Sequence, residues 1–94
     1  MDIGYIWDEN KYEKVLKERG IRFEDVVSAL DDPEGYEQED PNCDFEERWL
    51  YVGETTSGRI LVVIFTEEDL PLYRIVTAFE AEGRWLDEYE KHRN

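Results

Sequence analysis

The segment Ile60–Phe65 constrains the fold most, because it is an unbroken run of apolar residues. Such a run, bounded by turn-forming residues, is typical of a strand that is buried on both faces. Segments 48–53 and 72–79 flank it, and both are rich in β-branched and aromatic residues. The links between the three segments are short, so we expect an antiparallel meander with 60–65 as its central strand.

The other regular segments surround this meander. Residues 9–19 contain neither Gly nor Pro; Asp8 before them is a typical N-cap, and Gly20 after them is a typical helix stop. The remaining predicted elements are a strand at 3–7 and helices at 23–31 and about 82–92. The predicted order is β-α-α-β-β-β-α, an α+β fold with helices packed on an antiparallel sheet, in a single domain over residues 1–94. The expected core consists of Trp7, Tyr12, Leu16, Val26, Leu30, Leu50, Val52, Leu61, Val63, Ile75, Val76 and Trp85.

Residues 31–47 carry most of the excess negative charge of the chain. They hold nine acidic residues and no basic one, within a formal net charge of -14. Pro33, Gly35 and Pro41 interrupt this segment, so we predict a long loop. Its simplest role is a solvated connector. The alternatives are a docking surface for a basic protein, with Glu37, Glu39 and Asp40 as contacts, and a calcium site, although the EF-hand spacing is missing.

The composition excludes several other classes of protein. A chain this acidic repels phosphate on average, so direct DNA binding is not expected. Cys43 has no cysteine to pair with and lies among acids that oppose thiolate formation, and His92 has no second ligand near it in the sequence. We therefore predict no metal and no cofactor. No apolar run reaches the roughly 20 residues of a membrane span, and no signal peptide is evident, so we expect a cytoplasmic protein.

Several local strings occur in an order that resembles one known family. They are Trp7-Asp8 before a lysine-bearing helix, Gly20-Ile21 followed by Phe23-Glu24, Asp31-Asp32-Pro33, Glu47-Arg48-Trp49, Ser57-Gly58-Arg59 and Arg74-Ile75-Val76-Thr77-Ala78. In this order they resemble the BrnT toxins, whose fold is similar to that of RelE-type ribonucleases. The resemblance implies the toxin of a type II toxin–antitoxin pair. Such a toxin cleaves RNA and is inhibited by an antitoxin, here expected to be a basic protein from an adjacent gene.

The resemblance also suggests which residues would act on RNA. Metal-independent cleavage needs a base, a proton donor and cations around the phosphate. Glu47 is the candidate base, and Arg48 and Arg74 are candidates for holding the phosphate. The alternative for both arginines is pairing with loop acids. The predicted RNA contacts are Lys17, Arg19 and Arg59.

The chain departs from the usual pattern of the family at four positions. Val15 and Arg19 stand where the family usually has Asn and His, and Phe79 and Glu80 stand where it has Arg and a basic or polar residue. An Arg in place of a His keeps the charge but does not titrate near neutral pH. These changes oppose catalysis and leave a second hypothesis open, in which the same fold is a non-catalytic acidic module that docks a basic protein.

Overall fold

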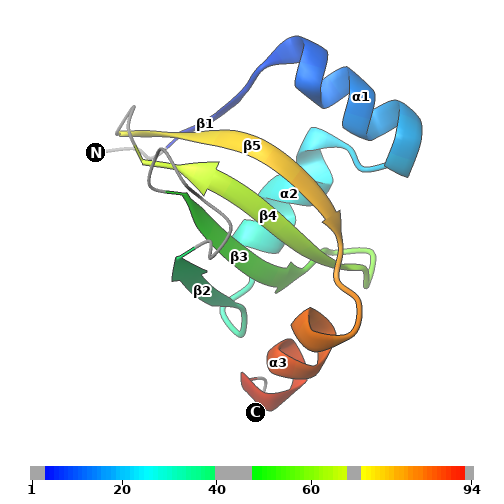
Figure 1. Cartoon of the computed structure of the whole chain (residues 1–94), viewed down its shortest axis with the longest axis vertical. Coiled ribbons are helices and arrows are strands. Elements are labelled where there is room, and N and C mark those ends of the chain that lie inside the picture. Colours follow the sequence, from blue (N-terminus) through cyan, green and yellow to red (C-terminus); the bar gives the residue numbers. More distant parts are fainter. Residues whose placement is uncertain (1–3, 40–47, 68–70, 93–94) are drawn as a thin grey trace.

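The computed structural model describes residues 4–39, 48–67 and 71–92 (Figure 1). Within these ranges the elements are, in chain order, β1 (Gly4–Trp7), α1 (Glu9–Arg19), α2 (Phe23–Leu30), β2 (Tyr36–Glu39), β3 (Trp49–Glu54), β4 (Ile60–Thr66), β5 (Leu72–Glu80) and α3 (Arg84–His92). The α+β class and the succession of helices and strands are confirmed, apart from β2 and the direction of β1. None of the helices in the described ranges has the length and apolarity needed to cross a membrane.

The described strands form one sheet in the order β1-β5-β4-β3-β2. β4 is central, and its antiparallel pairing with β3 and β5 confirms the predicted meander. The prediction of a wholly antiparallel sheet is wrong at one edge, where β1 runs parallel to β5, from Gly4 opposite Leu72 to Trp7 opposite Ile75. Loop length suggests direction only for strands that follow one another directly in the chain. β1 and β5 are separated by most of the chain, so their pairing is decided by tertiary packing.

The prediction of one long acidic loop is also wrong over Tyr36–Glu39. These residues form β2, which pairs antiparallel with β3 from Tyr36 opposite Val52 to Glu39 opposite Trp49. Glu37 and Glu39 are exposed and alternate with half-buried neighbours. Charged side chains are common on edge strands because they discourage further pairing. Here they gave the segment the composition of a loop, so the strand was not predicted. Residues 40–47, which include Asp40 and Glu47, lie outside the described ranges.

Helices cover both faces of the sheet, so each face has its own apolar core. α1 and α2 pack on one face, where Val15, Ile21 and Val26 lie against Leu61 and Val63. α3 packs on the other face, where Tyr89 lies against residues of β3 and β4. Figure 1 shows α2 passing behind β4 and α3 at the lower end of the sheet.

The predicted core is confirmed for the strands and needs correction in α1. The fully buried members are Val26, Leu50, Val52, Leu61, Val63 and Ile75, and the half-buried ones are Trp7, Tyr12, Leu30, Val76 and Trp85. Leu16 is 39% exposed, and Val15 is the buried residue of α1 in its place. A short helix that meets the sheet along a narrow stripe buries few of its apolar positions.

Two local features position the helices for the site described below. Asp8 caps α1, because its Oδ2 accepts a hydrogen bond from the Lys11 N–H at 3.1 Å, and Gly20 ends α1 with a φ of 65°. At Gly53, a Cβ atom would stand 2.1 Å from the carbonyl oxygen of Ala29. Only glycine therefore lets α2 approach β3 this closely.

Asp32 ties the end of α2 to β3 and α3. Its Oδ1 accepts from the Glu34 N–H at 2.9 Å, and its Oδ2 accepts from the Glu54 N–H at 2.8 Å and from the Tyr89 hydroxyl at 2.5 Å. The Tyr51 hydroxyl donates to the Asp32 carbonyl oxygen. This acid of the 31–47 segment is thus part of the folded framework.

Candidate functional site

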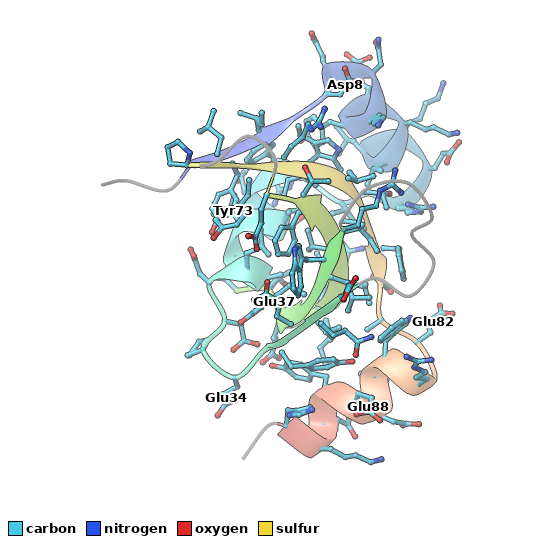
Figure 2. The ribbon with its side chains drawn as sticks, turned by 60° about the vertical axis from the view of Figure 1, so that its left-hand side comes forward. Asp8, Glu34, Glu37, Tyr73, Glu82 and Glu88 are labelled. Carbon is cyan, nitrogen blue, oxygen red and sulfur yellow. The ribbon has the colours of Figure 1, made fainter. Side chains whose placement is uncertain are left out.

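A recess of about 260 Å³ lies where the first turn of α1 meets β4 and β5. It is lined by Asp8, Lys11, Thr66, Arg74, Ile75 and Val76. Its polar groups are a carboxylate, a hydroxyl and two cationic side chains. Figure 2 shows Asp8 at the start of α1, at the opposite end of the molecule from Glu34 and Glu88.

The parallel pairing of β1 with β5 creates this recess. Trp7 is the last paired residue of β1 and lies opposite Ile75. The chain then enters α1 at once, so Asp8 and Lys11 arrive beside Arg74. On its other side, Arg74 lies opposite Thr66 of β4. Residues that oppose one another across strands share a face of the sheet, so Thr66 and Arg74 face the same way.

Two irregularities occur beside Arg74 and Thr66. Val76 is an extra residue of β5, because Ile64 pairs with Thr77 whereas Phe65 pairs with Ile75. Such bulges are frequent next to active sites, where they redirect side chains. The Thr66 hydroxyl is buried, and no polar atom of the described residues forms a hydrogen bond with it. A buried hydroxyl without a partner is uncommon and calls for an explanation.

Arg48 lies close to the same row of residues. It immediately precedes Trp49, which pairs with Phe65 on β4. Continuing this register by one residue brings Arg48 opposite Thr66, whose other neighbour is Arg74. Arg74 pairs with Thr66 and lines the recess, whereas Arg48 lies one residue before the first paired residue of β3 and does not line it. Glu47, the predicted base, lies outside the described residues.

The other predicted RNA contacts gather at the far end of α1. Arg19 donates from Nη1 to the Ala78 carbonyl oxygen at 2.9 Å and to Thr77 Oγ1 at 3.2 Å. Arg59 pairs with Glu80, with an Nη2 to Oε1 distance of 2.7 Å, and donates to the Gly20 carbonyl oxygen at 3.1 Å. These contacts attach α1 to β5 and give both guanidinium groups a structural role. Their contact with RNA stays a prediction, as does that of Lys17, which is exposed in the last turn of α1.

The four positions that differ from the usual family pattern do not line the recess. Val15 is buried in the core under α1. Arg19, Phe79 and Glu80 line a separate hollow with Glu82, at the C-terminal end of α1. The altered positions are therefore separate from the group formed by Asp8, Lys11, Thr66 and Arg74.

Glu37, one of the predicted docking residues, has a perturbed carboxyl group. Glu37 is exposed, but its partial desolvation still raises its pKa above the ordinary value of 4.5, and the Glu67 carboxylate raises it further. Because the native pKa lies above the unfolded one, folding favours the protonated form. The contribution of Glu37 to stability is therefore greatest below pH 4.5 and is lost as the pH rises through the native pKa.

We predict from this shift that Glu37→Gln raises the melting temperature at about pH 7, where the wild-type carboxyl is ionised. The gain should vanish below pH 4.5, where the wild-type group is protonated in both states. Thermal unfolding of both proteins across this range checks the sign. Glu39→Gln is the matched control because it removes the same charge from the same strand. An equal gain in the control would assign the effect to net charge alone.

Comparisons with known proteins agree with this architecture. The sequence model for the ribonuclease toxin BrnT of type II toxin–antitoxin systems matches residues 7–84. The chain belongs to the BrnT family. The crystal structure of the Brucella abortus ribonuclease toxin BrnT, at 1.1 Å resolution, is similar with a TM-score of 0.59, covering 87% of this chain and 100% of that one. The two sequences are 22% identical, so this match concerns the fold. No curated protein matches the sequence.

Membership of the BrnT family implies an antitoxin partner and an RNA substrate. The recess contains three residues to which the sequence analysis gave no role in the reaction. Asp8 was assigned only as a helix cap, and Lys11 and Thr66 carried no functional signal. The one available hint was the string Trp7-Asp8 leading directly into a helix that contains lysines. In the described residues, no group of three or more His, Cys, Asp or Glu side chains is placed to bind a metal ion.

Proposed function

We propose that this BrnT-family chain is a metal-independent endoribonuclease whose reaction centre is the recess between α1 and β5. One observation carries the proposal: a single recess is lined by a carboxylate, two cations and a hydroxyl that has no partner among the described residues. The separation of the recess from the four altered family positions supports retained activity.

The side chains of the recess match the needs of RNA cleavage. Attack of a ribose 2′-oxygen on the adjacent phosphorus requires removal of the hydroxyl proton, protonation of the departing 5′-oxygen, and stabilisation of the added negative charge. Asp8 is suited to accept the proton, and its hydrogen bond to the Lys11 N–H holds the carboxylate in place. Arg74 stabilises the phosphorane, and the Lys11 ammonium donates a proton to the 5′-oxygen as the P–O5′ bond breaks. Arg48, which immediately precedes β3, is a further candidate to contact the phosphate. Glu47 is the alternative base.

The test of this proposal separates the chemistry of Asp8 from its capping role. Asn caps helices about as well as Asp, so Asp8→Asn should keep the melting temperature while lowering the cleavage rate by about 10²–10⁴-fold. The wild-type protein is incubated with total RNA in EDTA, and cleavage is followed by gel electrophoresis. Glu47→Gln is the parallel variant, and loss of activity in it alone would make Glu47 the base.

Growth of a bacterial host provides the second measurement. The wild-type chain should arrest growth when expressed alone, and co-expression of its antitoxin should prevent the arrest. Arg48→Ala and Asp8→Asn should relieve the arrest with folding intact, whereas relief by Glu47→Ala but not by Asp8→Asn would make Glu47 the base. Absence of both arrest and RNA cleavage would contradict the ribonuclease proposal.

A second candidate function rests on β2. Among the described strands, β2 is at the sheet edge, and it exposes Glu37 and Glu39. An edge strand offers unpaired backbone groups to a partner, and acidic side chains beside it favour a basic one. We propose that this edge, together with Asp40, docks a basic antitoxin from an adjacent gene. If the chain cleaves no RNA, it acts as a non-catalytic binding module through this surface.

Combined neutralisation of Glu37, Glu39 and Asp40 tests the docking surface. With the protein encoded by the adjacent gene as partner, we expect the association rate to fall much more than the dissociation rate rises, because exposed charges steer approach. The wild-type association rate should also fall steeply with added salt, since screening limits exposed charges to about 8–10 Å near physiological ionic strength. Stopped-flow mixing measures the association rate and its dependence on salt, and also the dissociation rate. An unchanged association rate would indicate that the acidic segment 31–47 only connects its neighbours and does not dock a partner.

A further inference from the structure

We infer that the cavity under the end of α2 binds the cationic group of an arginine or lysine side chain from a protein partner. The cavity has a volume of about 190 Å³. It is lined by Tyr5, Leu30, Glu37, Tyr51, Phe65 and Tyr73. Drug-sized ligands occupy pockets of roughly 300–1,000 Å³, so this cavity suits a single long side chain. The inference does not depend on RNA cleavage.

Four of the six lining residues are aromatic, and we call this lining the aromatic cage. Each of the described strands contributes one residue to it: Tyr5 from β1, Tyr73 from β5, Phe65 from β4, Tyr51 from β3 and Glu37 from β2. The rings of Tyr5 and Tyr73 stack with centroids 5.9 Å apart, and Phe65 meets Tyr73 edge-on at 5.4 Å. These contacts hold the rings in place before any ligand binds. Figure 2 labels Tyr73 and Glu37.

Glu37 lines this cage, and the charges of Asp31 and Asp32 act on its tyrosines. Burial raises the pKa of Tyr5, and Asp31 raises it further. Burial also raises the pKa of Tyr51, and the negative charges of Asp32, Glu37 and Asp31 raise it further. Glu67 acts on Glu37 in the same direction. Within the described ranges, Asp31, Glu37 and Glu67 form no ion pair with a cationic side chain.

These features together select a cation as the ligand. The faces of aromatic rings attract a cation placed over them, and carboxylates at the rim strengthen that attraction in a partly desolvated site. An anion is repelled by the same groups and by a net charge of -14. A neutral apolar ligand gains nothing from the acids. A basic protein partner supplies the required group on a flexible side chain.

The cage and the recess have no lining residue in common. Phe65 and Tyr73 belong to the cage, whereas their neighbours Thr66 and Arg74 line the recess. Successive residues of a strand point to opposite faces. An occupant of the cage therefore leaves Arg74 accessible, and binding and cleavage can be measured independently.

An NMR titration of the full chain tests the cage. The probes are N-acetyl-arginine N-methylamide, its lysine counterpart, and the citrulline derivative, which has nearly the shape of arginine without its charge. We expect saturable shifts of the Tyr5, Tyr51 and Tyr73 ring signals with at least one cationic probe. The citrulline derivative should bind at least about ten-fold more weakly, as expected for loss of a partly desolvated cation–π contact.

Variants of the rim and the cage complete the test. Glu37→Gln should weaken binding of the cationic probe about three-fold or more, and added salt should reduce the difference. Glu90→Gln removes the same charge from an exposed position on α3, outside the cavity lining, and should leave binding unchanged. Tyr73→Leu should weaken binding about ten-fold.

Three outcomes would overturn the inference. They are equal binding of the citrulline derivative, equal effects of Glu37→Gln and Glu90→Gln, and ring shifts that do not saturate. Glu37→Gln changes an exposed side chain, so it keeps the test valid if Tyr73→Leu fails to fold. Failure here leaves both the ribonuclease proposal and docking along β2 standing, because their tests measure cleavage and partner association.

Discussion

A protein with Asp in place of Val63 should not fold. Val63 is fully buried in β4, opposite Tyr51 on one side and Ala78 on the other. An unpaired carboxylate in such a site costs several kcal/mol or shifts its pKa far upward at similar cost. Domains of this size are stable by only about 5–15 kcal/mol. Circular dichroism and a thermal scan should therefore show no cooperative transition.

Val63→Ala is the matched control for this prediction. It keeps the strand apolar and removes two methyl groups, for a cost of about 1–3 kcal/mol. The control should remain folded with a lower melting temperature. If Val63→Asp is soluble and unfolds cooperatively near the wild-type temperature, β4 is not the central buried strand.

The second large effect concerns Arg74, whose removal should lower kcat/KM for RNA cleavage by at least about 10²-fold. Arg74 is the cation that β5 brings into the recess beside Asp8 and Lys11. Loss of a preorganised positive charge leaves the phosphorane poorly stabilised while the core is unchanged. Arg74→Lys should recover only part of the rate, because an ammonium cannot bind two phosphate oxygens in the planar geometry of a guanidinium.

Arg84→Ala is the control for Arg74→Ala. Arg84 lies on α3, where its guanidinium stacks 4.5 Å from the centroid of Trp85. Arg84→Ala removes the same charge from the chain as Arg74→Ala, but Arg84 does not line the recess. Both variants should keep the wild-type fold, measured by thermal unfolding. Full activity in Arg74→Ala, or an equal loss in Arg84→Ala, would contradict the assigned role of Arg74.

Features with a local cause were predicted from the sequence. Asp8 and Gly20 bound α1 as expected, because capping depends on a side chain and a φ angle within a few residues of the helix end. The apolar run 60–65 is the central strand, because six apolar residues in a row must be covered on both faces. Local chemistry of this kind does not depend on where distant segments lie.

Features with a distant partner were missed. β2 was not predicted because its acidic residues lack the apolar pattern of a strand, and only its pairing with β3 makes it one. The direction of β1 was missed because its partner β5 is near the other end of the chain. Val15 is buried instead of Leu16 because the orientation of α1 on β5 selects the buried stripe.

By itself, the amino-acid sequence determined the α+β class, the meander around β4, the caps of α1 and the resemblance to the BrnT family. Only the tertiary structure decided which polar residues meet. Arg74 was a candidate from the sequence, but Asp8 and Lys11 join it through the parallel pairing of β1 with β5. The aromatic cage likewise needs one residue from each described strand. Local pattern reflects interactions between near neighbours, whereas a binding site depends on contacts between residues far apart in the chain.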